Sequence, residues 1–302
     1  MFNIKILKIS FFLFFSCYFT GCSVKQIVIN NLLNSSTNGV SSIYLTENDP
    51  ELVRESLPTN IKLIELLIQQ SPNSSGLLIS ASQVLTVYSY AFILKDAEYV
   101  LDEDFKKSRI LTQRGKKLLF RARQYAIDAI ETKHKDFFSN FSKDYEKYLL
   151  DLDKDDLDEI YWLAASWALL ISISQDDPKM LAELPKIGLL IDRGIQINEN
   201  YENGSFYDVK FSYDLARPDI SDEIAIQSYE KAIELANGSR ASLYLSYAES
   251  ISLKNQNKTE FLKLINQVLT YDTEKYPNQR LSNILAQERA QWLKSRIDLL
   301  FF

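Results

Sequence analysis

Residues 221–238, which read SDEIAIQSYEKAIELANG, contain the clearest helix of the sequence together with both of its ends. Ser221 is a good helix cap, the two acids after it suit a helix N-terminus, and the closing Asn-Gly pair tolerates left-handed backbone. Between these ends, Ala225, Tyr229 and Ala232 share one face. Small residues let helices approach closely and an aromatic ring fills the groove between them, so the stretch predicts a helix packed among other helices.

The same small–aromatic–small spacing is typical of the second helix of a tetratricopeptide hairpin. Weaker matches occur at residues 122–131, 193–201 and 261–268. Any amphipathic helix can produce one such match by chance, but four in one chain favour a repeat. The sequence therefore predicts an all-α fold, a tetratricopeptide-like helical-hairpin solenoid with degenerate repeats.

Helical patterns continue on both sides of this stretch, and no convincing strand alternation interrupts them. Asp49-Pro50 can begin the first helix and Pro58 a second one, since proline is tolerated in a first helical turn. Residues 77–94 lack proline and glycine and are strongly apolar, which predicts a helix buried on most sides. Further helices are expected over residues 108–133, 157–174, 178–197, 239–253, 258–269 and 281–300.

The N-terminus has the layout of a secretory signal. Lys5 and Lys8 precede an apolar core that is shorter than a membrane-spanning helix, and small residues lead to Cys22. This order resembles a bacterial lipobox, although Phe19 stands where leucine is commoner; the alternative is an ordinary signal with a chance cysteine. We expect a signal peptide at 1–21, lipidation of Cys22, a flexible Ser/Asn-rich tether at 22–48, and a helical domain at 49–302.

Charge and cysteine content narrow the possible partners. Removing residues 1–21, and with them Lys5 and Lys8, changes the net charge from −6 to −8. Such a chain is not steered by its net charge toward nucleic acid or anionic lipid, so membrane contact is expected through the acyl chains. Cys17 leaves with the signal and Cys22 is consumed by lipid, so the mature domain is expected to hold no disulfide and no cysteine metal site.

The sequence offers little to catalysis. His134 is the only histidine, it lies at a charged helix end, and no Gly-x-Ser-x-Gly elbow accompanies it. The acidic run 151–155 resembles the start of an EF-hand, but Asp156 and Trp162 replace the glycine and glutamate that the loop needs. We read this run as a linker and helix start. The prediction is a protein that is not an enzyme and has no catalytic residue, metal or cofactor.

Aromatic side chains on apolar helices are the candidate ligand-binding residues, because the first helices of a solenoid line its concave face. Core packing is the alternative role for each of them. The candidates are Tyr88, Phe92, Trp162, Trp167, Tyr207 and Tyr244.

An ordered series of motifs over residues 41–302 resembles one known family. It comprises the 48–58 segment, Tyr88–Phe92, Tyr161–Trp167, the turn at 201–204, Ser228–Ala232 and residues 281–290. The chain is similar to the T component of tetratricopeptide-associated TRAP transporters, which are periplasmic lipoproteins; Tyr207 stands where a histidine would be expected.

The resemblance implies a homotrimer with a pore or groove through each protomer. It also implies docking of the substrate-binding P component and the binding or passing of a small, partly apolar organic acid. The expected location is the periplasmic side of the cell envelope, anchored to the inner or outer membrane. The first alternative is an envelope scaffold with tetratricopeptide-like helices and no small-molecule ligand, and the second is a hydrolase that uses carboxylates, which the residues disfavour.

Overall fold

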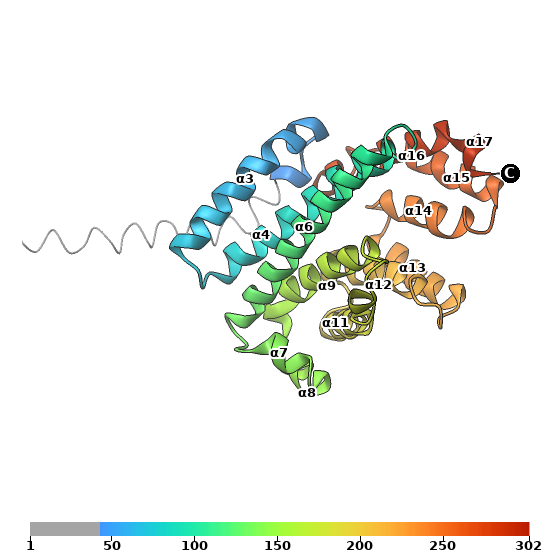
Figure 1. The fold of residues 1–302 in the computed structure, drawn as a ribbon. Helices are drawn as coiled ribbons and strands as arrows, with labels where there is room; N and C mark the ends of the chain where they lie inside the picture. Colours follow the sequence, from blue (N-terminus) through green and yellow to red (C-terminus); the bar gives the residue numbers. More distant parts are fainter. Residues whose placement is uncertain (1–42, 302) are drawn as a thin grey trace, which may run out of the picture. The chain divides into compact units, whose positions relative to one another are not determined.

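A computed structural model describes residues 43–301 of the protein. The predicted signal peptide, Cys22 and most of the predicted tether lie outside these residues. Within them the chain is built of helices and connecting turns, without a strand (Figure 1). The predicted all-α class is therefore confirmed.

The helices follow one another through short connections. The N-terminal half contains α3 (Pro50–Gln70), α4 (Ser75–Tyr88), η1 (Ser89–Leu94), α5 (Lys95–Tyr99), α6 (Phe105–Glu131), α7 (Phe137–Phe141), α8 (Tyr145–Leu150), η2 (Lys154–Asp156) and α9 (Leu157–Ser172). The C-terminal half contains α10 (Pro178–Leu181), α11 (Leu184–Ile197), η3 (Tyr201–Asn203), α12 (Ser205–Leu215), α13 (Asp222–Ala236), α14 (Ser242–Tyr247), η4 (Ala248–Ser252), α15 (Lys258–Leu269), η5 (Pro277–Gln279), α16 (Arg280–Ser295) and α17 (Ile297–Leu300).

Local signals at helix ends act as expected in two places. The Asp49 carboxylate accepts hydrogen bonds from the backbone N–H groups of Glu51 and Leu52, which caps α3. Asn237 and Gly238 both adopt left-handed backbone and end α13.

Two predicted helix boundaries are wrong, and a proline lies near each of them. Pro58 does not open a second helix, because α3 runs through it from Pro50 to Gln70. One missing N–H is tolerated there since the buried side chains of α3 hold the helix against its neighbours. The helix expected over 178–197 is instead two helices, because Pro185 has no N–H to donate to Leu181 and lies in the first turn of α11, which begins at Leu184.

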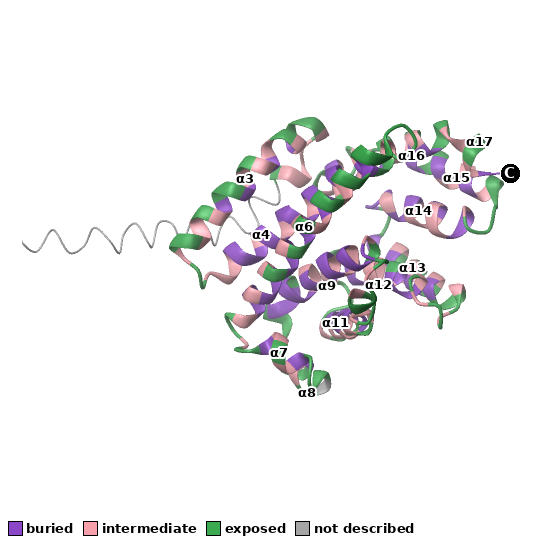
Figure 2. Cartoon of the chain, viewed as in Figure 1, coloured by how far each residue is buried: buried purple, intermediate pink, exposed green. Residues whose placement is uncertain are grey.

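The helix expected at 77–94 is confirmed as the buried core element. α4, η1 and α5 form one continuous helix, Ser75–Tyr99, that is long and apolar enough to cross a membrane. In its most apolar window 67% of the helix is buried inside the protein, which is how the core helix of a globular domain behaves (Figure 2).

Neighbouring helices pack on one another in sequence order until the chain returns to its start. α3 packs on α4, α4 on α6, α6 on α9, α9 on α11, and so on to α15 on α16. α16 then also contacts α3, and Leu281 joins the apolar cluster of α3 and α4. Tyr44, which the sequence analysis placed in the tether, packs against the same cluster. Sequential packing is what a tetratricopeptide-like array needs, and the repeat itself stays a prediction.

Polar contacts join the two ends of this array. Lys95 lies 3.1 Å from Glu288, and Arg289 donates to Glu98 at 2.5 Å. Arg296 pairs with Asp102. We call these contacts, made by α5 and the turn after it with α16 and the residue after it, the seam.

Candidate functional site

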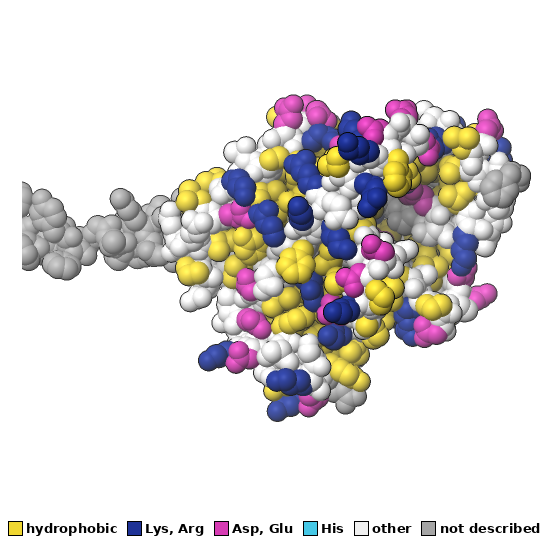
Figure 3. Space-filling model, viewed as in Figure 1, with side chains coloured by type: hydrophobic (Ala, Val, Ile, Leu, Met, Phe, Trp, Pro, Cys, Tyr) yellow, Lys and Arg dark blue, Asp and Glu magenta, His cyan; other side chains and the backbone are white. Residues whose placement is uncertain are grey.

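A recess lies where helices from both halves of the chain meet beside the seam. Figure 3 shows the surface hollowed between α14 on one side and α9 and α12 on the other. Five electrostatically linked side chains come from the helices around it, and we call this group the central hollow. They are Tyr90 of η1, Tyr161 of α9, Asp208 of α12, Glu249 of η4 and Arg289 of α16.

Two of these residues lie on π-helical segments. Tyr90 belongs to η1 and Glu249 to η4, and each segment continues an α-helix without a break. A π segment widens the helix by one residue per turn and re-aims its side chains, which is why such segments are frequent at functional sites. Both π segments of the described chain thus contribute to the central hollow.

Tyr90 has an exposed side chain on a segment whose other residues are largely buried. Its residue surface is 60% exposed, although η1 is otherwise largely buried. Burial among the neighbouring helices raises the pKa of Tyr90 to about 12, and the negative charges of Glu249 and Asp208 act in the same direction. Tyr90 is therefore an exposed phenol whose closest charged neighbours include the carboxylates of Glu249 and Asp208.

Arg289 organises the charges on one side of the hollow. Its Nε donates to Glu249 Oε1 at 2.9 Å, and its Nη2 reaches both Glu249 and Glu98. Burial lowers the pKa of Arg289, but Glu249 and Glu98 outweigh that effect and raise it above its ordinary value. Burial also raises the pKa of Glu249 against the opposing effect of Arg289. The guanidinium lies 4.5 Å from the ring centre of Trp292, so this cation is held from several sides.

The opposite side of the hollow contains a second arginine–carboxylate pair. Arg240 Nη1 lies 3.6 Å from Asp208, and Arg240 Nη2 donates to the Asn203 carbonyl at 2.8 Å. Burial raises the pKa of Asp208 while Arg240 lowers it, with burial the larger effect. The pKa of Tyr161 is raised to about 12 by burial and then by Asp208.

Aromatic rings continue the wall beyond Tyr161. Tyr161 meets Trp162 edge-on at 5.1 Å, and its centroid is 5.5 Å from both Tyr201 and Phe206. Phe206 fits because Gly194 faces it: a Cβ on Gly194 would lie 2.2 Å from the ring. The hollow therefore combines an aromatic wall with phenol, carboxylate and guanidinium groups.

The predicted ligand-binding aromatics fall into two groups. Tyr88, Phe92 and Trp167 are buried, where Tyr88 accepts a hydrogen bond from Arg114 and Trp167 donates one to Glu183. Phe92 lies under the Arg54 guanidinium, and Trp167 under Arg123 at 4.0 Å. In this conformation these three rings contribute to packing.

The second group is partly open. Trp162 lies beside Tyr161 at the hollow. Tyr207 donates to Glu199 at 3.4 Å, and Tyr244 packs against the cluster of α14, α15 and α16. Ligand contact by any of the six remains a prediction.

Sequence reasoning missed the charged members of the hollow. Asp208, Glu249 and Arg289 were not singled out, because each looks like an ordinary charge on an amphipathic helix. Arg289 is 40 residues away from Glu249 in the sequence and 191 residues away from Glu98. No local sequence pattern can therefore indicate that these side chains pair.

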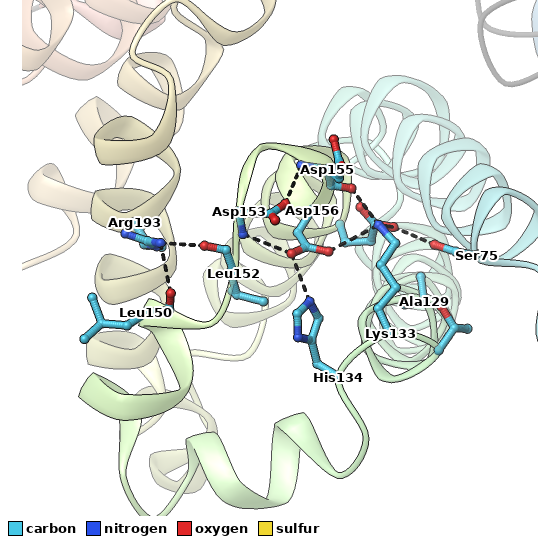
Figure 4. Close-up of polar contacts among 12 residues, drawn as sticks. Ser75, Ala129, Lys133, His134, Leu150, Leu152, Asp153, Asp155, Asp156 and Arg193 are labelled. Atoms are coloured by element: carbon cyan, nitrogen blue, oxygen red, sulfur yellow. Dashed lines mark hydrogen bonds and ion pairs between the residues drawn. The ribbon is translucent and has the colours of Figure 1, made fainter.

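A separate charged cluster surrounds His134 and is structural (Figure 4). Asp156 Oδ2 lies 2.9 Å from His134 Nε2 and accepts from the Asp153 N–H at 3.0 Å, while Lys133 lies 3.2 Å from the other oxygen. Burial raises the pKa of Asp156, but these bonds outweigh it and the net pKa is lowered. Asp153 and Asp156 form a capping box, which agrees with reading the 151–155 run as a helix start.

Comparisons with known proteins agree with the resemblance seen in the sequence. A family model described as TRAP transporter T-component matches residues 46–301. An uncharacterized protein of Treponema pallidum (strain Nichols) is 23% identical over 315 residues, which cover 97% of this chain and 98% of the relative. Since the family match spans nearly the whole described body, this chain belongs to the TRAP transporter T-component family.

Proposed function

We propose that the protein is a non-enzymatic, lipid-anchored component of a TRAP transport system that passes a small organic acid through the central hollow. The observation that carries this proposal is Tyr90, an exposed phenol that is electrostatically linked to Glu249, Asp208 and Arg289. The phenol is protonated at neutral pH, so it can donate a hydrogen bond to a ligand carboxylate. The rings of Tyr161 and Trp162 offer an apolar surface for the rest of the ligand.

The partner of this step is the substrate-binding P component, which delivers the ligand to the mouth of the hollow. Family membership supports association with a TRAP system. The trimer and the periplasmic location, with the anchor at Cys22, belong to the same proposal. The lipid holds the protein at the membrane, and the tether lets the helical body meet a soluble partner.

Native mass spectrometry of the delipidated protein, with and without a TRAP substrate-binding P component from the same organism, tests this function. The expected result is a trimer, a P-component complex and a retained small molecule. A Tyr90→Ala variant should keep the trimer and lose the small molecule, while Tyr145→Ala on α8 is the matched exposed-tyrosine control. Absence of trimer, ligand and complex together would remove the proposal's support.

One observation favours the alternative of a scaffold without a small-molecule ligand. A groove of about 240 Å³ opens between α13, the end of α14 and α15, lined in part by Tyr229, Tyr247 and Leu264. The ring centroids of Tyr229 and Tyr247 are 4.7 Å apart. Such paired rings offer a binding surface for an extended or helical peptide. A P-component complex that forms without any small molecule, and that Tyr247→Ala weakens, would favour this alternative.

A further inference from the structure

The outer face of α6 carries a concentration of positive charge that the acidic composition of the chain conceals. Residues 105–127 contain eight Lys and Arg residues and no Asp or Glu, although the whole chain has a net charge of −6. Figure 3 shows dark-blue side chains gathered along this helix. We call the exposed side of α6 the basic face. It includes Phe105, Lys106, Arg109, Ile110, Arg114, Lys117 and Phe120.

Cations of this face are not neutralised within the described part of the chain. Lys106, Arg109 and Lys117 make no ion pair with a described carboxylate, and Arg114 instead donates to the Tyr88 hydroxyl at 3.0 Å. Of the three acids that directly precede the helix, Asp102 pairs with Arg296 and Asp104 accepts from a backbone N–H to cap α6, while Glu103 makes no ion pair with a described cation of the basic face. The basic face therefore presents free positive charge to whatever approaches it.

Large apolar side chains protrude between these cations. Phe105 is 64% exposed, Ile110 60% and Phe120 55%. The N-terminal part of the face also lines an open groove of about 580 Å³. Cations interleaved with exposed rings suit a surface that offers anionic headgroups above an apolar layer.

We propose that the basic face of α6 docks on the anionic phospholipid headgroups of a membrane. From Phe105 to Phe120 the basic face spans about 22 Å along the helix, so it can lie along a planar surface. Lipids diffuse laterally and can gather at scattered cations without needing a complementary shape. Charge complementarity thus favours an anionic bilayer as the occupant over a rigid protein surface.

The length of chain before α3 fits this occupant. This step rests on the proposed function, because it assumes that Cys22 carries the lipid anchor. From Cys22 to Ile43 the chain can extend by at most about 70 Å, so an anchored body stays within reach of the bilayer. Tethering at that range raises the effective concentration of the basic face at the membrane, and weak electrostatic contact then suffices to orient it.

Vesicle co-sedimentation of the non-acylated chain tests the proposal independently of transport. The protein is residues 22–302 with Cys22→Ser, and the vesicles are equimolar phosphatidylglycerol and phosphatidylcholine, or phosphatidylcholine alone. We expect binding to the anionic vesicles only, weakened by added salt. The triple variant K106E/R109E/K117E should bind about 100-fold more weakly, as expected for three lost headgroup contacts of about fivefold each.

A matched control removes the same charge elsewhere. Lys143, Lys179 and Lys275 are exposed lysines on other segments, and K143E/K179E/K275E gives the same net charge. Equal binding by the two triple variants would overturn the proposal, as would equal binding to neutral vesicles. Dissociation of an oligomer or loss of P-component binding by the α6 variant, with vesicle binding intact, would instead assign the face to a protein interface. Failure of the native mass spectrometry test leaves the vesicle result untouched, so the two proposals fail separately.

Discussion

Arg289 of α16 donates hydrogen bonds to Glu98 of α5 at 2.5 Å and to Glu249 of η4 at 2.6 Å. One guanidinium thus links the first third of the chain to the last third. It also neutralises a carboxylate of the central hollow, so the seam and the candidate site share a residue.

Replacing Arg289 should therefore destabilise the fold as well as alter the hollow. Arg289→Met leaves Glu249 largely buried without its cation, which we expect to lower the free energy of unfolding by about 2–4 kcal/mol. Urea denaturation followed by circular dichroism measures this change. Lys258→Met, which breaks an exposed pair with Asp298, is the control and should have little effect. Equal stability of the two variants would contradict a structural role for the seam.

Close packing of Gly194 against Phe206 predicts a second destabilisation. Gly194→Ala places a methyl group 2.2 Å from the ring and should cost about 1–3 kcal/mol in the free energy of unfolding. Phe206→Leu alone should also destabilise, because it shrinks a buried ring. The double variant should be more stable than the sum of the two effects predicts, as a double-mutant cycle would reveal. Additive effects would mean that the two residues do not compete for the same space.

Asp156 predicts a loss of stability in acid. Its pKa is lowered in the folded protein, so its contribution is present above the ordinary value of 3.8 and is lost as pH falls below that value. Asp156→Asn should lower the free energy of unfolding by about 2–4 kcal/mol at neutral pH, since Asp156 is 2% exposed and paired.

The same variant should show a smaller further decline in acid than the unmodified protein. Urea midpoints measured at several pH values on both sides of 3.8 check this expectation. Asp176→Asn, at an exposed position, serves as the control. Parallel pH profiles for all three proteins would refute the linkage.

Core packing and ligand contact can be separated at two tryptophans. Trp167 is fully buried beside Arg123 and Glu183, so Trp167→Ala should lower the free energy of unfolding by about 3–5 kcal/mol. Trp162 is partly open at the hollow, so Trp162→Ala should cost less stability and reduce retention of the small molecule in native mass spectrometry. A stable Trp167→Ala protein that loses ligand would reverse these roles.

Much of the fold could be predicted because its signals are local. Asp49 caps α3, Asn237 ends α13 in left-handed backbone, and the apolar run of 77–94 is buried. Proline positions were less informative because the effect of a missing N–H depends on the surrounding contacts. Pro58 is accommodated within α3, whereas Pro185 lies in the first turn of α11.

The site could be predicted only in part. Tyr88, Tyr90 and Phe92 are spaced by two residues, so a helix cannot place all three on one face. Both faces of this helix are apolar in sequence, and only the packing of α6 and α3 decides that Tyr90 is the open ring. The basic face of α6 was visible as a run without acids, but net charge averages over segments and concealed it.

The return of α16 to α3 and α5 has a consequence for cooperativity. In an open repeat array each unit contacts only its neighbours, so an end can fray or be deleted while the rest stays folded. Here the last long helix completes contacts made by the first, so its loss removes partners from both ends at once. Such a chain gains no tolerance to truncation from its modular helices, and its two ends should unfold together.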